Sequence, residues 1–295
     1  MKKKEREKEE LISVIIATRD RSEVLLRSLY ALDAQSEEGW PFEVIVVDDG
    51  STDGTGSLVK SASVNFPLSC ISRPPGGPAA ARNAGLERAK GRAVLFLNDD
   101  CLADGELLAR HRERLREYGG ECAVLGRIEW APEVECSALL RELVGKYYFP
   151  FYQIEGQEEV SFAYFITGNL SAPLEKIKEA GGFDEDFREA AFEDVELGYR
   201  MYQLGVPLKY NPSALAHHAH SLDFDDLFER QRKIAYWLNV LLAKHPEAAK
   251  FYPGINTSFL PELPAGNRSC LEMILRYASY RGLKEGRVEL LDREG

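Results

Sequence analysis

Two stretches of the sequence decide the fold: LISVIIA at residues 11–17 and FEVIVV at residues 42–47. Both are short, rich in β-branched residues and apolar on both faces, which is typical of strands buried in a parallel sheet. Between them, residues 22–35 carry apolar side chains at helical spacing, with Ser22 as the expected N-cap. The chain is therefore predicted to begin as strand, helix, strand.

The same alternation continues through the first half of the chain. We expect a helix after Ser51, a strand at Leu68 to Ser72, a helix at Ala79 to Lys90 that ends at Gly91, and a strand at Ala93 to Leu97. Repeated units of this length predict a doubly wound, mostly parallel α/β sheet flanked by helices, with right-handed crossovers. Ligands of such sheets bind beyond the carboxyl ends of the strands.

Acidic side chains gather after three of the expected strands. Asp20 follows the first strand, Asp48 and Asp49 follow the second, and Asp99 and Asp100 follow the fourth. Carboxylates this close together repel one another. We therefore expect a metal ion or several hydrogen-bond donors among them.

Three common binding motifs are disfavoured. The acidic loop that starts at Asp49 resembles an EF-hand, but its twelfth position is Lys60, where calcium needs a bidentate glutamate. The sequence contains neither the GxGxxG dinucleotide fingerprint nor the GxxxxGK[ST] phosphate loop. Calcium-binding, nicotinamide-dependent and P-loop functions are therefore not expected.

Composition and charge narrow the class of protein further. The 295 residues include 37 Lys and Arg against 48 Asp and Glu, a formal net charge of -11, which disfavours nucleic acid as a partner because phosphates require a basic surface. No apolar run approaches the roughly 18 residues of a transmembrane segment. Residues 1–10 are expected to be a disordered charged tail without a secretory leader. With five cysteines and no C-x-x-C pair, we expect reduced thiols and a cytoplasmic location.

The second half of the chain is less regular. The expected elements are a helix at Glu106 to Tyr118, a strand at Cys122 to Trp130, a helix that opens at Glu193 and a helix at Asp225 to Ala243. Three of the five histidines fall within His217 to His220, at the end of a short strand. The aromatic stretch Tyr147 to Tyr152 is expected to pack in the core, with a platform for an acceptor sugar as the alternative.

Six short motifs follow one another in order between residues 11 and 221. They are SVIIATRDR at 13–21, VVDDGSTD at 46–53, ARNAG at 81–85, FLNDD at 96–100, GGFDE at 181–185 and EDVEL at 193–197. Together they resemble the motif set of family 2 glycosyltransferases with the GT-A fold. The resemblance implies a GT-A domain at 11–221, with a nucleotide-binding half at 11–105, an acceptor half at 106–221 and a C-terminal helical extension at 222–295.

The resemblance also implies an activity and a set of donor-binding residues. The enzyme would move a sugar, with inversion, from a nucleotide-diphosphate donor of the UDP, GDP or dTDP type to a hydroxyl of a glycan, lipid-linked or small-molecule acceptor. Thr18 and Arg19 would line the pocket for the nucleotide base, which Asp49 would bind. Arg82 and Asn83 would lie near the ribose and phosphates.

A divalent metal, Mn²⁺ or Mg²⁺, is the implied cofactor. Asp100 would be its main ligand, with Asp99 beside it. The histidine cluster would supply a further ligand, for which His218 is preferred and His220 is the alternative, because these two share a face of an extended strand. Asn98 replaces the first acid of the usual D-x-D motif; its amide could still bond to a sugar or ribose hydroxyl, but one charge is lost.

Asp194 matches the general base of the family, and Glu193 and Asn169 would lie on the acceptor side. A sugar hydroxyl is a poor nucleophile until a carboxylate within hydrogen-bond reach takes its proton. Two other functions stay open. Asn98 is compatible with a nucleotide-sugar-binding protein of weak or no turnover, and the histidine cluster with a metal-dependent hydrolase.

Overall fold

A computed structural model describes residues 11–35, 41–135 and 137–252 of the chain. These residues form two compact units, one of residues 11–135 and 151–221 and the other of residues 137–150 and 222–252. Residues 137–150, which the expected organisation puts in the acceptor half, group here with the described residues after 221. The predicted tail at 1–10, the predicted extension beyond 252, and Cys136 and Cys270 lie outside the described residues.

The strands all belong to the first unit. Their bounds are β1 (Ile12–Thr18), β2 (Phe42–Asp48), β3 (Leu68–Ser72), β4 (Ala93–Leu97), β5 (Cys101–Ala103), β6 (Ala123–Trp130), β7 (Glu159–Val160), β8 (Asn169–Pro173) and β9 (Leu208–His218). The helices of this unit are α2 (Ser22–Asp33), α3 (Thr55–Ser61), α4 (Pro78–Arg88), α5 (Leu107–Glu117), α7 (Leu174–Glu179) and α8 (Glu193–Gln203), with the 3₁₀ turns η1 (Phe151–Ile154) and η2 (Phe162–Tyr164).

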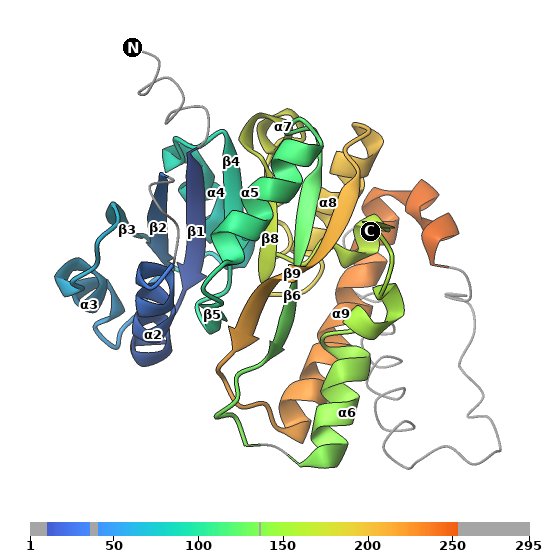
Figure 1. Cartoon of the computed structure of the whole chain (residues 1–295). Helices are drawn as coiled ribbons and strands as arrows, with labels where there is room; N and C mark the ends of the chain where they lie inside the picture. Colours follow the sequence, from blue (N-terminus) through green and yellow to red (C-terminus); the bar gives the residue numbers. More distant parts are fainter. Residues whose placement is uncertain (1–10, 36–40, 136, 253–295) are drawn as a thin grey trace. The chain divides into compact units, whose positions relative to one another are not determined.

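The sheet has the order β3-β2-β1-β4-β8-β6-β9-β5, and β7 pairs with β9 (Figure 1). Neighbours among β3, β2, β1 and β4 are parallel, whereas β8 runs antiparallel between β4 and β6. Right-handed crossovers from β1 to β2 to β3 put α2 and α3 on one face, and the return from β3 to β4 puts α4 on the other. The predicted mostly parallel α/β sheet flanked by helices is confirmed.

The core forms where the sequence is apolar on both faces. In β1, β2 and β4 nearly every side chain is buried, and α2 turns Leu25, Leu29 and Leu32 inward. Full burial of each such leucine stabilises the fold by roughly 1.5–3 kcal/mol. The predicted N-cap at Ser22 is wrong, because α2 begins at Ser22 itself. The backbone N–H of Ser22 is satisfied from another loop, by Asp53 Oδ2 at 3.1 Å.

The second unit contains α6 (Ala138–Tyr147), α9 (Phe224–Lys244) and the 3₁₀ turn η3 (Pro246–Phe251). A capping box between Asp223 and Asp226 starts α9. Leu143 of α6 and Leu227 of α9 are both buried and pack together, so this unit has a small apolar cluster of its own.

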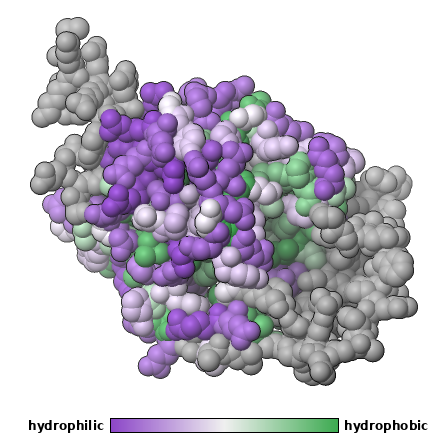
Figure 2. Space-filling view, turned by 45° about the vertical axis from the view of Figure 1, so that its right-hand side comes forward, coloured by the Kyte–Doolittle hydropathy of each residue, from purple (hydrophilic) through white to green (hydrophobic). Residues whose placement is uncertain are grey.

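Hydrophilic residues cover most of the coloured surface in Figure 2. The large hydrophobic side chains that are exposed in the described part of the chain are few and scattered, namely Tyr30, Tyr152, Tyr202 and Leu204. Across residues 11–35, 41–135 and 137–252, no helix combines the length and apolar character needed to cross a membrane.

Candidate active site

The parallel register brings the predicted strand ends to one edge of the sheet. Thr18 of β1 lies opposite Asp48 of β2, and the N–H of Asp49 donates to the carbonyl of Thr18 at 2.9 Å. From the other neighbouring strand, Asp99 accepts a hydrogen bond on Oδ2 from the Thr18 hydroxyl at 2.8 Å. Thr18 is only 4% exposed. Its two hydrogen bonds connect Asp49 and Asp99 to the end of β1.

Arg21 bridges the two carboxylates that follow β4. Its Nη1 lies 2.6 Å from Asp100 Oδ2 and 3.2 Å from Asp99 Oδ1. Burial and the neighbouring Asp100 charge raise the pKa of Asp99 to about 6. Burial opposes ionisation of Asp100 as well, but its contacts with His218 and Arg21 outweigh burial and lower its pKa to about 2. A guanidinium is thus one of the donors that the clustered acids require.

His218 reaches this edge through strand pairing. The antiparallel register of β5 and β9 sets His218 opposite Cys101, next to Asp100, and His218 Nε2 lies 3.4 Å from Asp100 Oδ2. The ring of His218 also stands edge-on to Trp130, with centroids 5.7 Å apart. His217 points elsewhere, with Nε2 3.8 Å from Asp104 Oδ2. His220 is exposed beyond the strand, with its ring centroid 6.5 Å from that of His218.

The residues at this edge fit a divalent cation in part. Asp100 and His218 present a carboxylate oxygen and an imidazole nitrogen, a combination that Mn²⁺ accepts. Asp99 differs from the expectation, because its two oxygens accept from Thr18 and Arg21. Within the described ranges, no three His, Cys, Asp or Glu side chains are grouped closely enough to hold a metal. A cation here would therefore need further oxygen ligands from a substrate or water.

Asp194 is held at the start of α8 by the turn that precedes β8. Its Oδ2 accepts from the backbone N–H of Thr167 at 3.2 Å and from the Thr167 hydroxyl at 3.4 Å. The next residue, Gly168, accepts on its carbonyl from the N–H of Asn98 at 3.2 Å. The carboxylate of Asp194 is therefore linked through one turn to the motif that carries Asp99 and Asp100.

The backbone just before Asp194 is strained. Phe192 has φ 70°, a left-handed conformation that is costly for a side chain of this size. Such residues persist where surrounding contacts hold them, often at functional sites.

Arg82 and Glu193 form a buried ion pair. Arg82 Nη1 lies 2.8 Å from Glu193 Oε1, and the side chains are 10% and 3% exposed. The Arg82 guanidinium also lies over the ring of Phe183, 5.6 Å from its centroid. Burial and the charge of Asp194 raise the pKa of Glu193 to about 7. In this structure the pair joins α4 to the first turn of α8, so neither side chain stands open to donor or acceptor.

Asn83 makes a second connection from α4. Its amide donates to the carbonyl of Phe183 at 2.9 Å and accepts from the N–H of Phe183 at 2.8 Å. The same Nδ2 donates to Glu185 Oε1 at 2.9 Å. Asn83 therefore fixes the 181–185 motif beside the donor half of the sheet.

Asp49 organises the Pro/Gly loop before α4. Its carboxylate accepts from the N–H groups of Gly76 and Gly77 and from Arg73 Nη1 at 2.5 Å. Gly77 has φ 89°, and a Cβ there would lie 2.3 Å from the carbonyl of Arg188, so no larger residue fits. Arg19, by contrast, is more than half exposed, with Nε 3.6 Å from Asp20.

The expectation for Asn169 is not met. Its side chain is completely buried, and Nδ2 donates to the carbonyls of Arg127 and Ala214. Its Oδ1 lies 2.8 Å from Nε2 of His111, a histidine whose pKa burial lowers to about 4. Asn169 thus connects neighbouring strands inside the sheet and has no surface to offer an acceptor.

Arg21, Arg73 and Thr167 were missed as site residues by sequence reasoning. Arg73 directly follows β3, so the rule used for the other strand ends would have found it. Arg21 closes the first quoted motif, but its contact with Asp99 and Asp100 spans more than 75 positions of the chain. Thr167 lies outside the six motifs, and nothing in its local sequence pairs it with Asp194.

The aromatic stretch has a mixed outcome. Phe151 is buried and stacks on Tyr210, with centroids 6.0 Å apart and planes inclined by 10°. Tyr152 is 60% exposed. Core packing therefore accounts for Phe151, and Tyr152 is available at the surface.

Comparison with known proteins gives relatives of one family. Residues 13–166, more than half of the chain, match Glycosyl transferase family 2. The chain is 31% identical over 224 residues to Validoxylamine A glucosyltransferase of Streptomyces hygroscopicus subsp. limoneus, which covers 67% of this chain and 49% of the relative. The chain thus spans about half the length of the first curated relatives that it matches.

Two solved structures share the fold. The mannosyltransferase PcManGT from Pyrobaculum calidifontis, in complex with GDP-Man and Mn²⁺, matches with a TM-score of 0.60 and 18% identity over 95% of this chain and 74% of that chain. S. aureus TarS 1-349 in complex with UDP matches with a TM-score of 0.58 and 19% identity over 96% and 91%. The family match over more than half of the chain, together with the 31% identity to the Streptomyces relative, shows that the chain belongs to glycosyl transferase family 2.

Proposed function

We propose that this chain transfers a sugar, with inversion, from a nucleotide-diphosphate donor of the UDP, GDP or dTDP type to a hydroxyl group of an acceptor. The observation that carries the proposal is the position of Asp194, which Thr167 holds one turn away from Asn98 and the acids that follow it. Family membership supports the same reaction. So do the structural neighbours, whose complexes contain GDP-Man with Mn²⁺ and UDP.

In the proposed reaction Asp194 is the general base. The acceptor hydroxyl attacks the anomeric carbon as the bond to the diphosphate breaks, and its proton passes to a carboxylate oxygen of Asp194. The Oδ2 atom is held by both donors of Thr167, while Oδ1 accepts from the N–H of Val195 at 2.8 Å. Positioned proton transfer contributes about 10²- to 10⁴-fold to the rate.

Asp100 and His218 would hold the divalent metal. When bound, Mn²⁺ or Mg²⁺ would offset the negative charge that the departing diphosphate gains. Asp99 would stay hydrogen-bonded to Thr18 beside the metal. His220 is the alternative to His218 as the histidine ligand. Arg21 would have to release the Asp100 carboxylate, or share it, when the donor binds, because its Nη1 lies 2.6 Å from Asp100 Oδ2.

On the donor side, Asp49 and Arg73 would face the nucleotide. Asp49 already accepts from Gly76 and Gly77, so we propose that it recognises the base with its remaining acceptor capacity while it shapes the loop. Arg73 is 24% exposed and can present positive charge to a phosphate. We propose that Arg19 lines the base pocket together with Thr18, and that the Asn98 amide bonds to a sugar or ribose hydroxyl.

A nucleotide-sugar-binding protein without turnover is the second candidate. It is favoured by Asn98 in place of the first acid and by the engagement of Asp99 with Thr18 and Arg21. A hydrolase built on the histidine cluster has less support, because His217 faces Asp104 while His218 faces Asp100.

A thermal-shift panel of nucleoside diphosphates, with and without Mn²⁺, tests the proposal. We expect one nucleotide to raise the melting temperature strongly only when Mn²⁺ is present, and Asp100→Asn to abolish that dependence. Asp225→Asn, an exposed change on α9, is the matched control. Absence of a shift with every nucleotide would overturn the proposed function, and a shift without turnover on any acceptor would favour the binding protein.

A further inference from the structure

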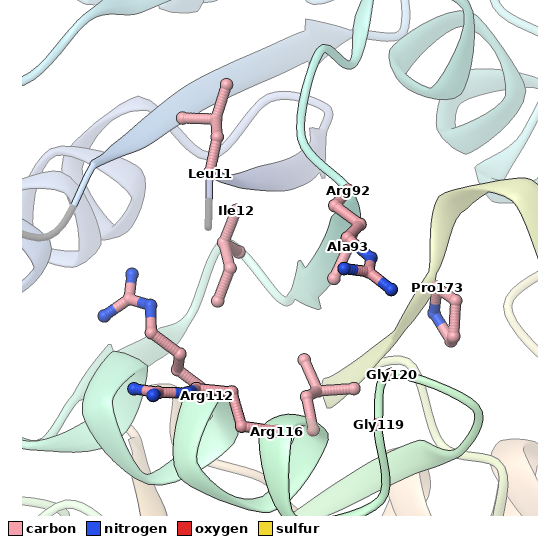
Figure 3. Close-up of a pocket in the computed structure, with 10 residues that line it drawn as sticks. Leu11, Ile12, Arg92, Ala93, Arg112, Arg116, Gly119, Gly120 and Pro173 are labelled. Atoms are coloured by element: carbon pink, nitrogen blue, oxygen red, sulfur yellow. The ribbon is translucent and has the colours of Figure 1, made fainter. Parts of the chain in front are cut away.

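A pocket of about 270 Å³ lies at the edge of the sheet opposite the proposed active site (Figure 3). Its walls come from the first residues of β1 and β4, from Pro173 at the end of β8, and from the last turns of α5 with the glycines that follow. β1 has seven residues from Ile12 to Thr18, so the pocket is about 20 Å from the Thr18 edge at 3.3 Å per residue. It is therefore separate from the donor site.

Positive charge is concentrated around this pocket. Three of its lining residues are Arg92, Arg112 and Arg116, and none of the described residues that line it is acidic. Figure 3 shows Arg92 on one side and Arg112 and Arg116 extending from α5 on the other. The chain as a whole has a net charge of -11, so a pocket lined by three arginines differs in sign from the protein as a whole.

Stabilisation of the α5 carboxyl end does not account for all three arginines. Arg116 lies in the last turn, where a cation is favoured by the helix dipole. Arg92 comes from a different segment, just before β4, and its guanidinium lies beside Gly120. Arg112 is only 5% exposed. Arg112 and Arg116 are also four positions apart on one helix, where like charges repel.

The remaining lining residues suit a small ligand. The floor of the pocket is apolar and consists of Leu11, Ile12, Ala93, Leu115 and Pro173. One wall carries no side chains, because it is formed by Gly119 and Gly120, whose φ angles are 64° and 77°. A site for one water molecule needs only roughly 10–15 Å³, so this pocket has room for a phosphate with a small organic group.

We propose that the pocket between β1, β4 and α5 binds a small anion that carries a phosphoryl group. Planar guanidinium groups donate paired hydrogen bonds to phosphate oxygens, and three of them match a doubly charged group better than a single carboxylate. The phosphoryl group comes either from free phosphate or from a phosphate ester.

Calorimetric titration of the full chain tests this proposal at constant ionic strength and without divalent metal or nucleotide. The probes are inorganic phosphate, glycerol 3-phosphate and, as a carboxylate of similar charge, malonate. We expect saturable binding of at least one phosphate probe in preference to malonate. Tighter glycerol 3-phosphate binding would identify an ester site, and tighter inorganic phosphate binding a site for the free ion.

Arg92→Gln and Arg116→Gln change exposed side chains, so they separate binding from folding more cleanly than a change at Arg112. Each is expected to weaken phosphate binding about tenfold or more, since a hydrogen bond to a charged group is lost. Arg88→Gln, an exposed arginine of α4 outside the pocket, is the matched control. The thermal shift with nucleotide and Mn²⁺ should stay the same in all three variants.

Three results would overturn the proposal: no saturable phosphate binding, an equal loss in Arg88→Gln, or preference for malonate. Competition between phosphate and a nucleoside diphosphate for one site would also contradict it, because the binding would then belong to the donor edge. If no nucleotide raises the melting temperature but phosphate still binds, the proposed function is overturned and the proposal for this pocket is not.

Discussion

The buried pair of Arg82 and Glu193 makes stability depend on pH in a way that a single substitution should expose. Burial and Asp194 raise the pKa of Glu193 from 4.5 to about 7. Between these values the folded state binds more protons than the unfolded state, so stability falls as pH rises through this window. A shift of this size corresponds to about 3 kcal/mol lost by pH 7 and above.

Replacing Arg82 by Met should enlarge that loss. The partner carboxylate is 3% exposed and 2.8 Å from the guanidinium, and removal of one member of a buried ion pair typically costs 3–5 kcal/mol. Below about pH 5, Glu193 is protonated in both proteins, so the cost of Arg82→Met should be small. Above pH 8 it should approach the full value, because the carboxylate is then charged and unneutralised.

Urea unfolding between pH 5 and 9, followed by circular dichroism, measures this dependence. The double variant Arg82→Met with Glu193→Gln should recover most of the lost stability at pH 8.5, because no buried charge remains. Lys90→Gln, which removes an exposed cation near Glu43, controls for net charge. A cost of Arg82→Met that is equal at pH 5 and pH 8.5, or below 1 kcal/mol throughout, would refute the reasoning.

Three further predictions rest on contacts of Arg21, His111 and Thr167. Arg21→Gln should bind Mn²⁺ about tenfold or more tightly in the absence of nucleotide, because a positive charge leaves Asp99 and Asp100; unchanged affinity in an equilibrium titration would contradict it. His111, whose pKa is lowered by burial from 6.5 to about 4, should cost stability as pH falls through that window, by about 3 kcal/mol in total. The dependence has the opposite sign to that of Glu193, so urea midpoints of His111→Gln and Glu193→Gln between pH 4 and 7 should diverge, and parallel curves would argue against both assignments. Thr167→Val should lower kcat about tenfold with KM nearly unchanged, because one donor to Asp194 is removed; a change in KM alone would point to a structural role.

The sheet could be predicted from the sequence because its signals are local. The β-branched runs at residues 11–17 and 42–47 are apolar on both faces, a pattern typical of strands buried in a parallel sheet, and β1 and β2 form there. The strand-end rule then placed Thr18, Asp49 and Asp99 at one edge, where the register of the parallel strands brings them together.

The roles of individual polar residues could not be predicted in the same way. The resemblance assigns both Asn169 and Asp194 to the acceptor reaction, yet Asn169 is enclosed between strands and Asp194 is held near the acidic edge. Their environments depend on partners far along the chain. Ser22 failed as a cap for the same reason, since Asp53 from a separate loop satisfies its N–H.

The sequence also does not show whether a metal ion or an arginine neutralises the carboxylates at the acidic edge. Clustered carboxylates predict a nearby positive charge, but they do not indicate whether Arg21 or Mn²⁺ supplies it. In the structure Arg21 bridges Asp99 and Asp100, and His218 stands 3.4 Å from Asp100.

The rate of sugar transfer by Asp194→Asn tests the central claim most directly. It should be measured with sugars linked to the nucleotide that the thermal-shift panel selects, with Mn²⁺ present and Asp225→Asn as control. We expect a fall of about 10²- to 10⁴-fold for Asp194→Asn, with unchanged metal-dependent nucleotide binding and a control rate equal to that of the unsubstituted chain. Transfer by Asp194→Asn at the rate of the control would contradict it.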